Sequence, residues 1–202
     1  MKFCKAAFLK RDTSRKYDVE GTRPELPDTL TDYLTGAEIP FSNRDNIRQK
    51  IVRFLVEEKG FLKEDIAVDR EIVFELDGAQ VSSLVDISVR LNGLTLIVWK
   101  CSSGSLVSRE RQIVASSRLL ESYVVPFAAV TNGKDIELLD SSAEEVIGSG
   151  FESIPTRQEL LKRVAHISLK MPNNKKIIYE QRILYTYDAI SCPVKSGQGP
   201  SP

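Results

Sequence analysis

The chain has 202 residues, of which 42% are hydrophobic and 28% charged, and its formal net charge is zero. This composition fits one globular domain with a substantial core, and no apolar run is long enough to span a bilayer. The zero charge argues against a protein that coats nucleic acid by bulk electrostatics, although basic residues cluster locally in stretches 1–16 and 157–176.

The first forty residues are polar and punctuated by prolines. We expect residues 1–40 to form an arm on the body of the domain, with one short helix at about 28–34. Ser42 and Asp45 then form a Ser-x-x-Asp capping box, which predicts a helix that reaches about Lys59. Its apolar residues recur at helical spacing: Ile47, Ile51, Phe54 and Leu55.

Three strand-like runs follow at residues 66–76, 83–91 and 94–101. Asn92-Gly93 separates the last two, and this dipeptide is the strongest short signal for a β-hairpin. The third run is apolar almost throughout, which is typical of a central strand buried on both faces. The second run alternates between apolar and polar residues, which suits a half-buried partner.

The next segments predict a crossover connection. Ser108 is expected to cap a helix that runs to about residue 123, and residues 126–131 form another apolar strand, with a return strand at 136–139. A strand–helix–strand connection of this length places the two strands parallel to each other. The predicted fold is therefore an α/β sandwich with a mixed central sheet.

The last quarter of the chain is expected to be helical. Residues 148–155 are interpreted as a linker, and Thr156 and Glu159 form a second capping box that opens a helix to about 167. A final helix is predicted over about 174–190. The domain division that follows is an arm over 1–40, a core over 41–140, a helical extension of the same domain over 141–195, and a disordered tail over 196–202.

One pair of residues indicates chemistry. Asp86 and Lys100 lie on two strands joined by the predicted hairpin, so one carboxylate and one amine are expected on neighbouring strands, as in a metal-dependent nuclease. Such a site normally carries a second carboxylate two residues before the lysine. That position is Val98, which cannot bind a metal ion.

These residues stand within an ordered set of short matches at 45–49, 58–61, 85–89, 98–101, Gln112 and 130–133. As an ordered set, they resemble the N-terminal nuclease domain of type I restriction enzyme restriction subunits, in the PD-(D/E)xK nuclease superfamily. The resemblance covers about residues 40–140 and implies a restriction-endonuclease-like α/β/α fold with the arm and the C-terminal helices outside it.

The resemblance also implies a site. In the superfamily the aspartate and the second acid bind Mg²⁺ and the lysine assists the attacking water, so Asp86, Lys100, Asp45 and Gln112 are the implied catalytic residues. The implied metal ligands are Asp86, the backbone carbonyl of Trp99, and Asp45 in place of the acid missing at 98. A site of this kind is expected to be weak, because losing a charged ligand costs about 2–4 kcal/mol or more of transition-state stabilisation.

Several alternatives stay open at this point. The missing acid has other candidates on the neighbouring helix and strand, namely Glu110, Glu121, Glu71 and Glu75. Asp45 reads equally well as a helix cap, and Gln112 as an exposed helical glutamine. The tyrosine expected one turn after Gln112 is Ser116 here, and Arg48 and Gln49 are either phosphate contacts or solvent-facing polar residues.

Other reaction classes have little support in the sequence. There is one histidine and no GxxxxGK[ST] motif, so histidine-based catalysis and the ATP-driven motor of full restriction subunits are not expected. The three scattered cysteines favour a reducing cytoplasm. Two hypotheses of different classes remain: a Mg²⁺-dependent endodeoxyribonuclease, and a non-catalytic module on a nuclease fold that binds DNA or a protein partner such as another restriction-modification subunit. The near-neutral charge also leaves open a third, a housekeeping binding protein that does not involve nucleic acid. The sequence does not decide the oligomeric state.

Overall fold

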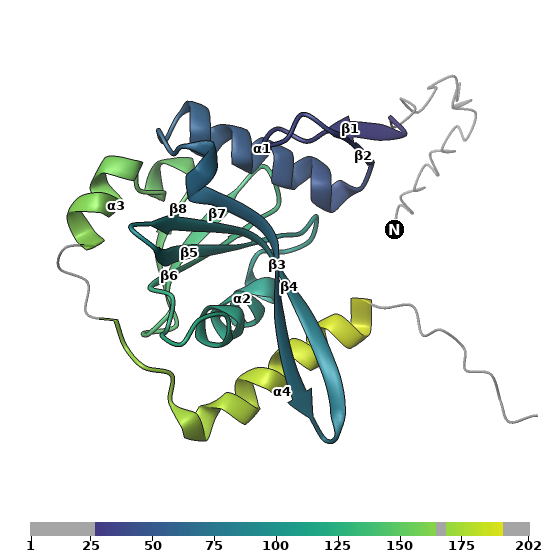
Figure 1. Cartoon of the computed structure of the whole chain (residues 1–202), viewed down its shortest axis with the longest axis vertical. Coiled ribbons are helices and arrows are strands. Elements are labelled where there is room, and N and C mark those ends of the chain that lie inside the picture. The colour runs from purple at the N-terminus through teal and green to yellow at the C-terminus, as the bar shows by residue number, and fades with distance from the viewer. Residues whose placement is uncertain (1–26, 165–168, 192–202) are drawn as a thin grey trace, which may run out of the picture.

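The structure is a computed structural model that describes residues 27–164 and 169–191 (Figure 1). The predicted arm up to residue 26, the end of the helix predicted to reach 167, and the predicted tail over 196–202 lie outside the described residues. No helix in the described part is long and apolar enough to cross a membrane.

A six-stranded mixed sheet forms the centre of the molecule, with its strands in chain order (Figure 1). Neighbouring strands of this sheet are antiparallel, with one exception. The two central strands, β5 (Leu94–Cys101) and β6 (Phe127–Thr131), are parallel to each other, as predicted. The strands are β3 Ile66–Leu76, β4 Ala79–Leu91, β5 Leu94–Cys101, β6 Phe127–Thr131, β7 Ile136–Asp140 and β8 Glu145–Ser149.

Helices cover both faces of this sheet, which confirms the expected α/β/α sandwich. The helices are α1 Asn43–Glu57, α2 Val107–Leu119, α3 Arg157–Val164 and α4 Asn174–Ser191. One apolar cluster joins α1 and α3 to one face, and a second joins α2 and α4 to the other. β5 lies between them, since Trp99 belongs to the first cluster and Val98 to the second.

The predicted hairpin between β4 and β5 is confirmed. Asn92 and Gly93 have φ angles of 52° and 80°, the left-handed conformations that a two-residue type I′ turn needs at both positions. Leu91 pairs with Leu94 directly across the turn. From this turn alone, residue 86 would lie opposite residue 99. A register shift between Val89 and Arg90 moves the pairing by one residue and brings residue 86 opposite residue 100.

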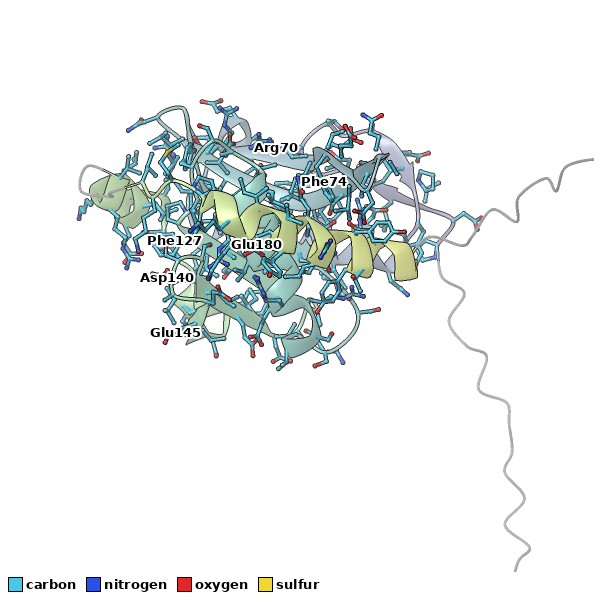
Figure 2. All side chains as sticks on the ribbon, turned by 90° about the horizontal axis from the view of Figure 1, so that it is seen from below. Arg70, Phe74, Phe127, Asp140, Glu145 and Glu180 are labelled. Carbon is cyan, nitrogen blue, oxygen red and sulfur yellow. The ribbon has the colours of Figure 1, made fainter. Side chains whose placement is uncertain are left out.

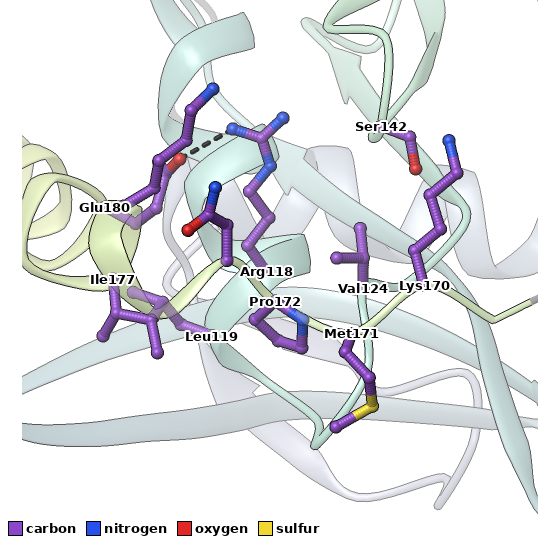
Figure 3. A pocket seen from close by; sticks show the side chains of 11 residues that line it. Arg118, Leu119, Val124, Ser142, Lys170, Met171, Pro172, Ile177 and Glu180 are labelled. Carbon is purple, nitrogen blue, oxygen red and sulfur yellow. Dashed lines mark hydrogen bonds and ion pairs between the residues drawn. The ribbon is translucent and has the colours of Figure 1, made fainter.

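The C-terminal helix α4 lies across α2 and the adjoining strands (Figure 2). Its Leu184 is fully buried in the second cluster. Glu180, only 2% exposed, binds Arg118 on α2 at 2.6 Å (Figure 3). The same carboxylate binds Arg111, also on α2, at 2.8 Å. A small cavity of about 170 Å³ adjoins these ion pairs, walled in part by Leu119 and Ile177. Buried apolar and ionic contacts therefore fix α4 to the sandwich.

Two predictions about local structure are wrong at the ends of the domain. Residues 28–34 form no helix but the start of a small hairpin, β1 Thr29–Thr31 and β2 Glu38–Pro40. Asp32 organises the connection, because its carboxylate accepts hydrogen bonds from the backbone N–H of Leu34 and Thr35. Residues 148–155 are not a plain linker either, since β8 forms the sheet edge over 145–149 and a 3₁₀ turn follows at Phe151–Ser153.

The boundaries of α2 also differ from the prediction. Ser108 does not cap the helix, because α2 begins at Val107 and the Ser108 hydroxyl donates to the Ser105 carbonyl instead. The helix ends at Leu119 rather than near residue 123, where the Tyr123 hydroxyl accepts a hydrogen bond from the Thr95 N–H of β5. By contrast, the predicted capping box at the start of α3 is confirmed in both directions. At α1, Ser42 caps the helix as predicted by accepting from the Asp45 N–H, but the Asp45 carboxylate accepts from the Ser42 hydroxyl and not from its backbone N–H.

Candidate functional site

The candidate site lies where β4 separates from β5. Backbone pairing between the two strands runs from the turn to the pair Ile87 and Trp99. At the next position the Cys101 N–H donates to the Asp86 carboxylate, Oδ2, at 2.6 Å. A side chain thus takes the place of a backbone acceptor, and the sheet opens at Asp86.

The structure brings Asp86 and Lys100 together, as the resemblance implies. The Lys100 Nζ lies 3.6 Å from Asp86 Oδ1 and donates to the Leu84 carbonyl at 3.2 Å. A second cation, the Arg44 guanidinium at the start of α1, also places its Nε 3.6 Å from Asp86 Oδ1. That oxygen is buried and has no hydrogen-bond partner.

Burial controls the protonation of Asp86. The side chain is fully buried, and desolvation raises the pKa of its carboxyl above the ordinary value of 3.8. The positive charge of Lys100 and the Cys101 N–H act in the opposite direction and lower the pKa in part. Asp86 is therefore a carboxyl whose charged form depends on its two cationic neighbours.

Asp45 lies in the network around this pair, but its carboxylate is already engaged. The Ser42 hydroxyl donates to Oδ2 at 2.5 Å, and Arg48 binds Oδ1 at 2.9 Å. Arg44 lies 3.7 Å from the same oxygen and is the residue that links Asp45 to Asp86. The structure thus supports the capping interpretation of Asp45, and its role as a metal ligand stays a prediction.

Sequence reasoning missed Asp69 and the role of Arg44. Asp69 lies in β3 opposite Asp86, at the one position where the pairing of β3 with β4 is interrupted. Its φ is 49°, a left-handed conformation that aspartate tolerates better than most residues. Both Arg44 and Arg48 bind its carboxylate. In the sequence, Asp69 is only one of several polar residues in the predicted strand 66–76. Nothing in that pattern indicates its left-handed backbone conformation.

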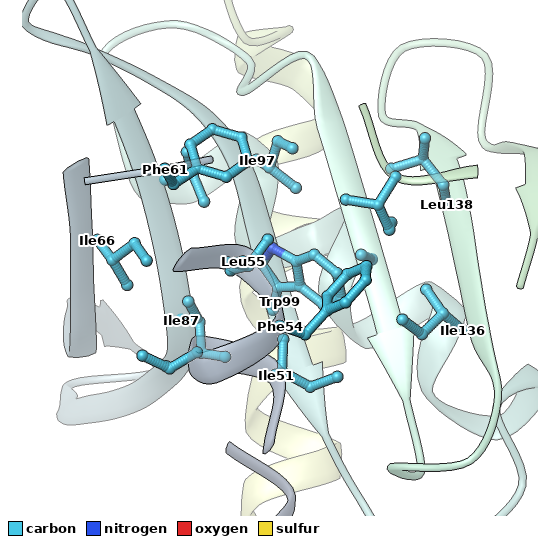
Figure 4. Packing of buried hydrophobic residues seen from close by; sticks show 14 of the residues in the cluster. Ile51, Phe54, Leu55, Phe61, Ile66, Ile87, Ile97, Trp99, Ile136 and Leu138 are labelled. Carbon is cyan, nitrogen blue, oxygen red and sulfur yellow. The ribbon is translucent and has the colours of Figure 1, made fainter. Parts of the chain in front are cut away.

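The other acids that were weighed as replacements for the missing ligand lie elsewhere. Glu121 binds Arg70 at 2.7 Å and accepts from Thr95 at 2.6 Å, and Glu71 accepts from the Ser82 hydroxyl. Neither these two nor Glu75 and Glu110 line the cleft described below. The Trp99 side chain packs in the core under α1 (Figure 4), while its backbone belongs to β5 beside Lys100.

A cleft of about 620 Å³ opens beside the Asp86–Lys100 pair. Three of its side chains are cations, four carry hydroxyls, one is an amide and one is an acid. Those residues are Arg44, Lys100 and Arg109, then Ser82, Ser83, Ser102 and Ser103, then Gln112, and Asp188. Buried polar atoms without a hydrogen-bond partner gather here too, namely Arg44 Nε, Ser83 Oγ and Asp188 Oδ2.

Gln112 is a buried wall of this cleft rather than an exposed helical residue. It is only 1% exposed, its Oε1 accepts from Arg109 at 3.2 Å, and its Nε2 donates to Asp188 Oδ1 at 3.2 Å. Asp188 belongs to α4 and was not singled out from the sequence. Because 76 residues separate it from Gln112, no local pattern could have indicated this contact.

The residues present do not fit a Mg²⁺ site of the implied kind. Val98 is fully buried in the apolar cluster under α2, so no ligand replaces the missing acid from that position. Asp86 Oδ2 accepts from a backbone N–H, and its Oδ1 faces two cations that oppose a third. In the described ranges, no three His, Cys, Asp or Glu side chains are grouped as metal ligands.

Comparison with known proteins identifies the family. The family model of the type I restriction enzyme R protein N terminus matches residues 43–155, which is more than half of the chain. No curated protein and no solved structure matches. The match begins at α1 and includes β8, so it extends beyond the region in which the sequence motifs were recognised, and α4 lies outside it. The chain therefore belongs to the family of type I restriction enzyme R protein N-terminal domains.

Proposed function

We propose that the chain is a non-catalytic nucleic-acid-binding domain whose cleft binds backbone phosphates of DNA. The observation that carries this proposal is the lining of the cleft, where Arg44, Lys100 and Arg109 stand among four serine hydroxyls and one amide. Cationic and hydroxyl donors are the groups with which proteins contact phosphate oxygens. The family membership supports DNA as the source of those phosphates.

The unpartnered atoms of the cleft agree with this ligand chemistry. Arg44 Nε and the Ser83 hydroxyl are buried donors without acceptors, and each unpaired buried donor costs about 1–3 kcal/mol. A phosphate oxygen is an acceptor for either. The cations are also held in place before any ligand arrives, because Lys100 donates to a backbone carbonyl and Arg44 binds Asp69.

The proposal treats the domain as non-catalytic because of Val98 and Asp86. A Mg²⁺ ion that activates water needs more than one carboxylate to hold it, and Val98 supplies none. Burial raises the pKa of the Asp86 carboxyl, and one of its oxygens lies beside the cations Lys100 and Arg44. Asp86 is therefore poorly suited to hold a Mg²⁺ ion as its sole carboxylate ligand.

Mg²⁺-dependent phosphodiester hydrolysis is the second candidate, and one observation favours it. Asp86 Oδ1 and Asp188 Oδ2 are both buried carboxylate oxygens without hydrogen-bond partners, one behind the cleft and one in its wall. Carboxylate oxygens are the ligand type that Mg²⁺ prefers, and these two are not engaged in hydrogen bonds.

The binding proposal is tested by fluorescence anisotropy with short labelled duplex and single-stranded DNA at low salt. We expect Lys100→Ala and Arg109→Ala each to weaken binding about tenfold, because each removes a charge-assisted phosphate contact. The matched control is Lys162→Ala, an exposed lysine on α3, which covers the opposite face of the sheet. Equal affinities for the wild type and both cleft variants would contradict the proposal.

The second candidate is tested by nicking of supercoiled plasmid with Mg²⁺ or Mn²⁺. We expect no nicking by the wild-type protein above the level given by Asp86→Ala. Nicking by the wild type that disappears in Asp86→Ala establishes hydrolysis in place of the non-catalytic proposal.

A further inference from the structure

The C-terminal helix contributes to the cleft although it lies outside the family match. α4 follows the matched residues 43–155 and lies across α2 (Figures 1 and 2). Near its end, Asp188 is one of the lining residues. A segment outside the matched residues therefore forms part of the wall of the cationic cleft.

Two contacts hold the end of α4 in this place. Gln112 donates to Asp188 Oδ1 at 3.2 Å, and the Arg109 guanidinium lies 5.7 Å from the centroid of the Tyr187 ring. Arg109 and Gln112 are thus both occupied by α4, and they are bonded to each other at 3.2 Å. These are donors that the proposed phosphate ligand also needs.

The charge of Asp188 sets it apart from the other cleft residues. It is the one acid among the described residues that line the cleft, and it faces a wall containing three cations. Its Oδ2 is buried without a hydrogen-bond partner, so burial leaves part of the hydrogen-bonding capacity of this carboxylate unused. A carboxylate and a phosphate are both anions that accept hydrogen bonds through terminal oxygens, and they compete for the same donors.

The remainder of α4 is anchored independently of Asp188. Leu184 and Glu180 are the buried contacts of the helix, and Asp188 lies one turn beyond Leu184. The side chains described after Leu184 are half-buried or exposed. Local opening at a helix end requires less free energy than undocking of the whole helix, so the last turn can move while α4 stays bound.

We propose that Asp188 is a tethered competitor for phosphate, so that the last turn of α4 lowers the affinity of the cleft for nucleic acid. This inference rests on the proposed function, since it concerns the same cleft. Removing the carboxylate charge weakens the competition for the Gln112 donor and removes a like-charge repulsion between Asp188 and the phosphate ligand.

The experiment compares Asp188→Asn with the wild type in the DNA anisotropy assay at low salt. Asparagine keeps the shape and the acceptor for Gln112 but removes the charge. We expect binding about tenfold tighter, because one repulsive charge next to the phosphate is lost. The matched control is Glu58→Gln, the same charge change on an exposed residue at the far end of α1 from Arg44, and it should bind as the wild type does.

A second readout separates failure of this inference from failure of the proposed function. Inorganic phosphate is titrated in thermal unfolding of both proteins, and it should raise the Tm of Asp188→Asn more than that of the wild type. If DNA binds the wild type and Asp188→Asn equally, or binds the variant more weakly, the competitor role is wrong while DNA binding stands. If neither protein binds DNA but phosphate stabilises only the variant, the DNA proposal fails and the competitor role stands.

Discussion

Asp86 is a buried carboxylate that sits where the sheet opens, between a backbone donor and two cations. One oxygen accepts from the Cys101 N–H and the other lies 3.6 Å from both Lys100 and Arg44. Such a residue organises the cleft wall, because it fixes the lysine that the cleft presents. The free-energy cost of burying the Asp86 side chain depends on pH, because burial favours the uncharged carboxyl over the carboxylate.

The first prediction concerns the pH dependence of stability. The pKa of Asp86 is raised above 3.8 in the folded state, so between the unfolded and folded pKa values the native protein binds more protons than the unfolded chain. The contribution of Asp86 to stability is therefore full below pH 3.8 and is lost as the pH rises through the folded pKa. Relative to Asp86→Asn, which has no such titration, the wild-type free energy of unfolding should fall over that window in urea denaturation. A difference that stays constant or grows in favour of the wild type is the opposite result.

At this scale the sequence predicted part of the site. Asp86 and Lys100 were identified because they match motif positions of a known family, and the structure places the Lys100 Nζ 3.6 Å from Asp86 Oδ1. Their alignment depends on a register shift within the β4–β5 hairpin, which the turn sequence does not reveal. Arg44, Asp69 and Asp188 were missed as parts of the site. Their roles depend on a left-handed backbone angle in β3 and on contacts between distant elements, which no spacing in the sequence encodes.

The helices show which local signals determine structure. The Ser42 capping box predicts α1 correctly, because the Asp45 N–H has its acceptor three residues back. Ser108 has the right residue type near the start of α2 but bonds to Ser105, and the helix begins without a side-chain cap. The β8 strand was missed because its exposed positions carry no alternation, so that only pairing with β7 defines it.

α4 behaves as part of the sandwich rather than as an appendage. Leu184 is fully buried among residues of α2 and the sheet, and the ion pairs of the buried Glu180 carboxylate with the partly exposed Arg111 and Arg118 fix the helix at its middle. Breaking one partner of a buried pair leaves a charge uncompensated, which makes such contacts hard to lose one at a time.

The second prediction tests this docking. Leu184→Ala removes a buried side chain and leaves a cavity, so the free energy of unfolding should fall by about 2–5 kcal/mol in urea denaturation. Ile178→Ala on the exposed side of the same helix is the control and should have a much smaller effect, since Ile178 is 54% exposed. Similar losses from both substitutions would mean that α4 is not seated in the core as described.

For the whole molecule, overall charge and local charge differ. The chain has 28 basic and 28 acidic residues, yet the cleft lining has three cations and one acid. An interaction with DNA must therefore be local, and its electrostatic part must be limited to the few phosphates that the cleft can reach. Nothing in the composition alone indicated this asymmetry, because it arises when α1, β5 and α2 are brought together by the fold.

The third prediction follows from this limit. Three cations that neutralise three phosphates give a slope of about −3 for log K against log salt concentration with duplex DNA. Lys100→Ala should reduce the magnitude of that slope by about one, and the control Lys162→Ala should leave it unchanged. Anisotropy titrations at several salt concentrations give the slope. A wild-type slope much steeper than about −3 would show that the binding surface extends beyond the cleft.

The separation of Gln112 and Asp188 by 76 residues has a consequence for synthesis. As the polypeptide leaves the ribosome, the β-sheet and α2 emerge before the segment that carries Asp188. Until that segment has been translated, the three cations have no tethered Asp188 carboxylate beside them, so the proposed competition can begin only after α4 docks on the sandwich.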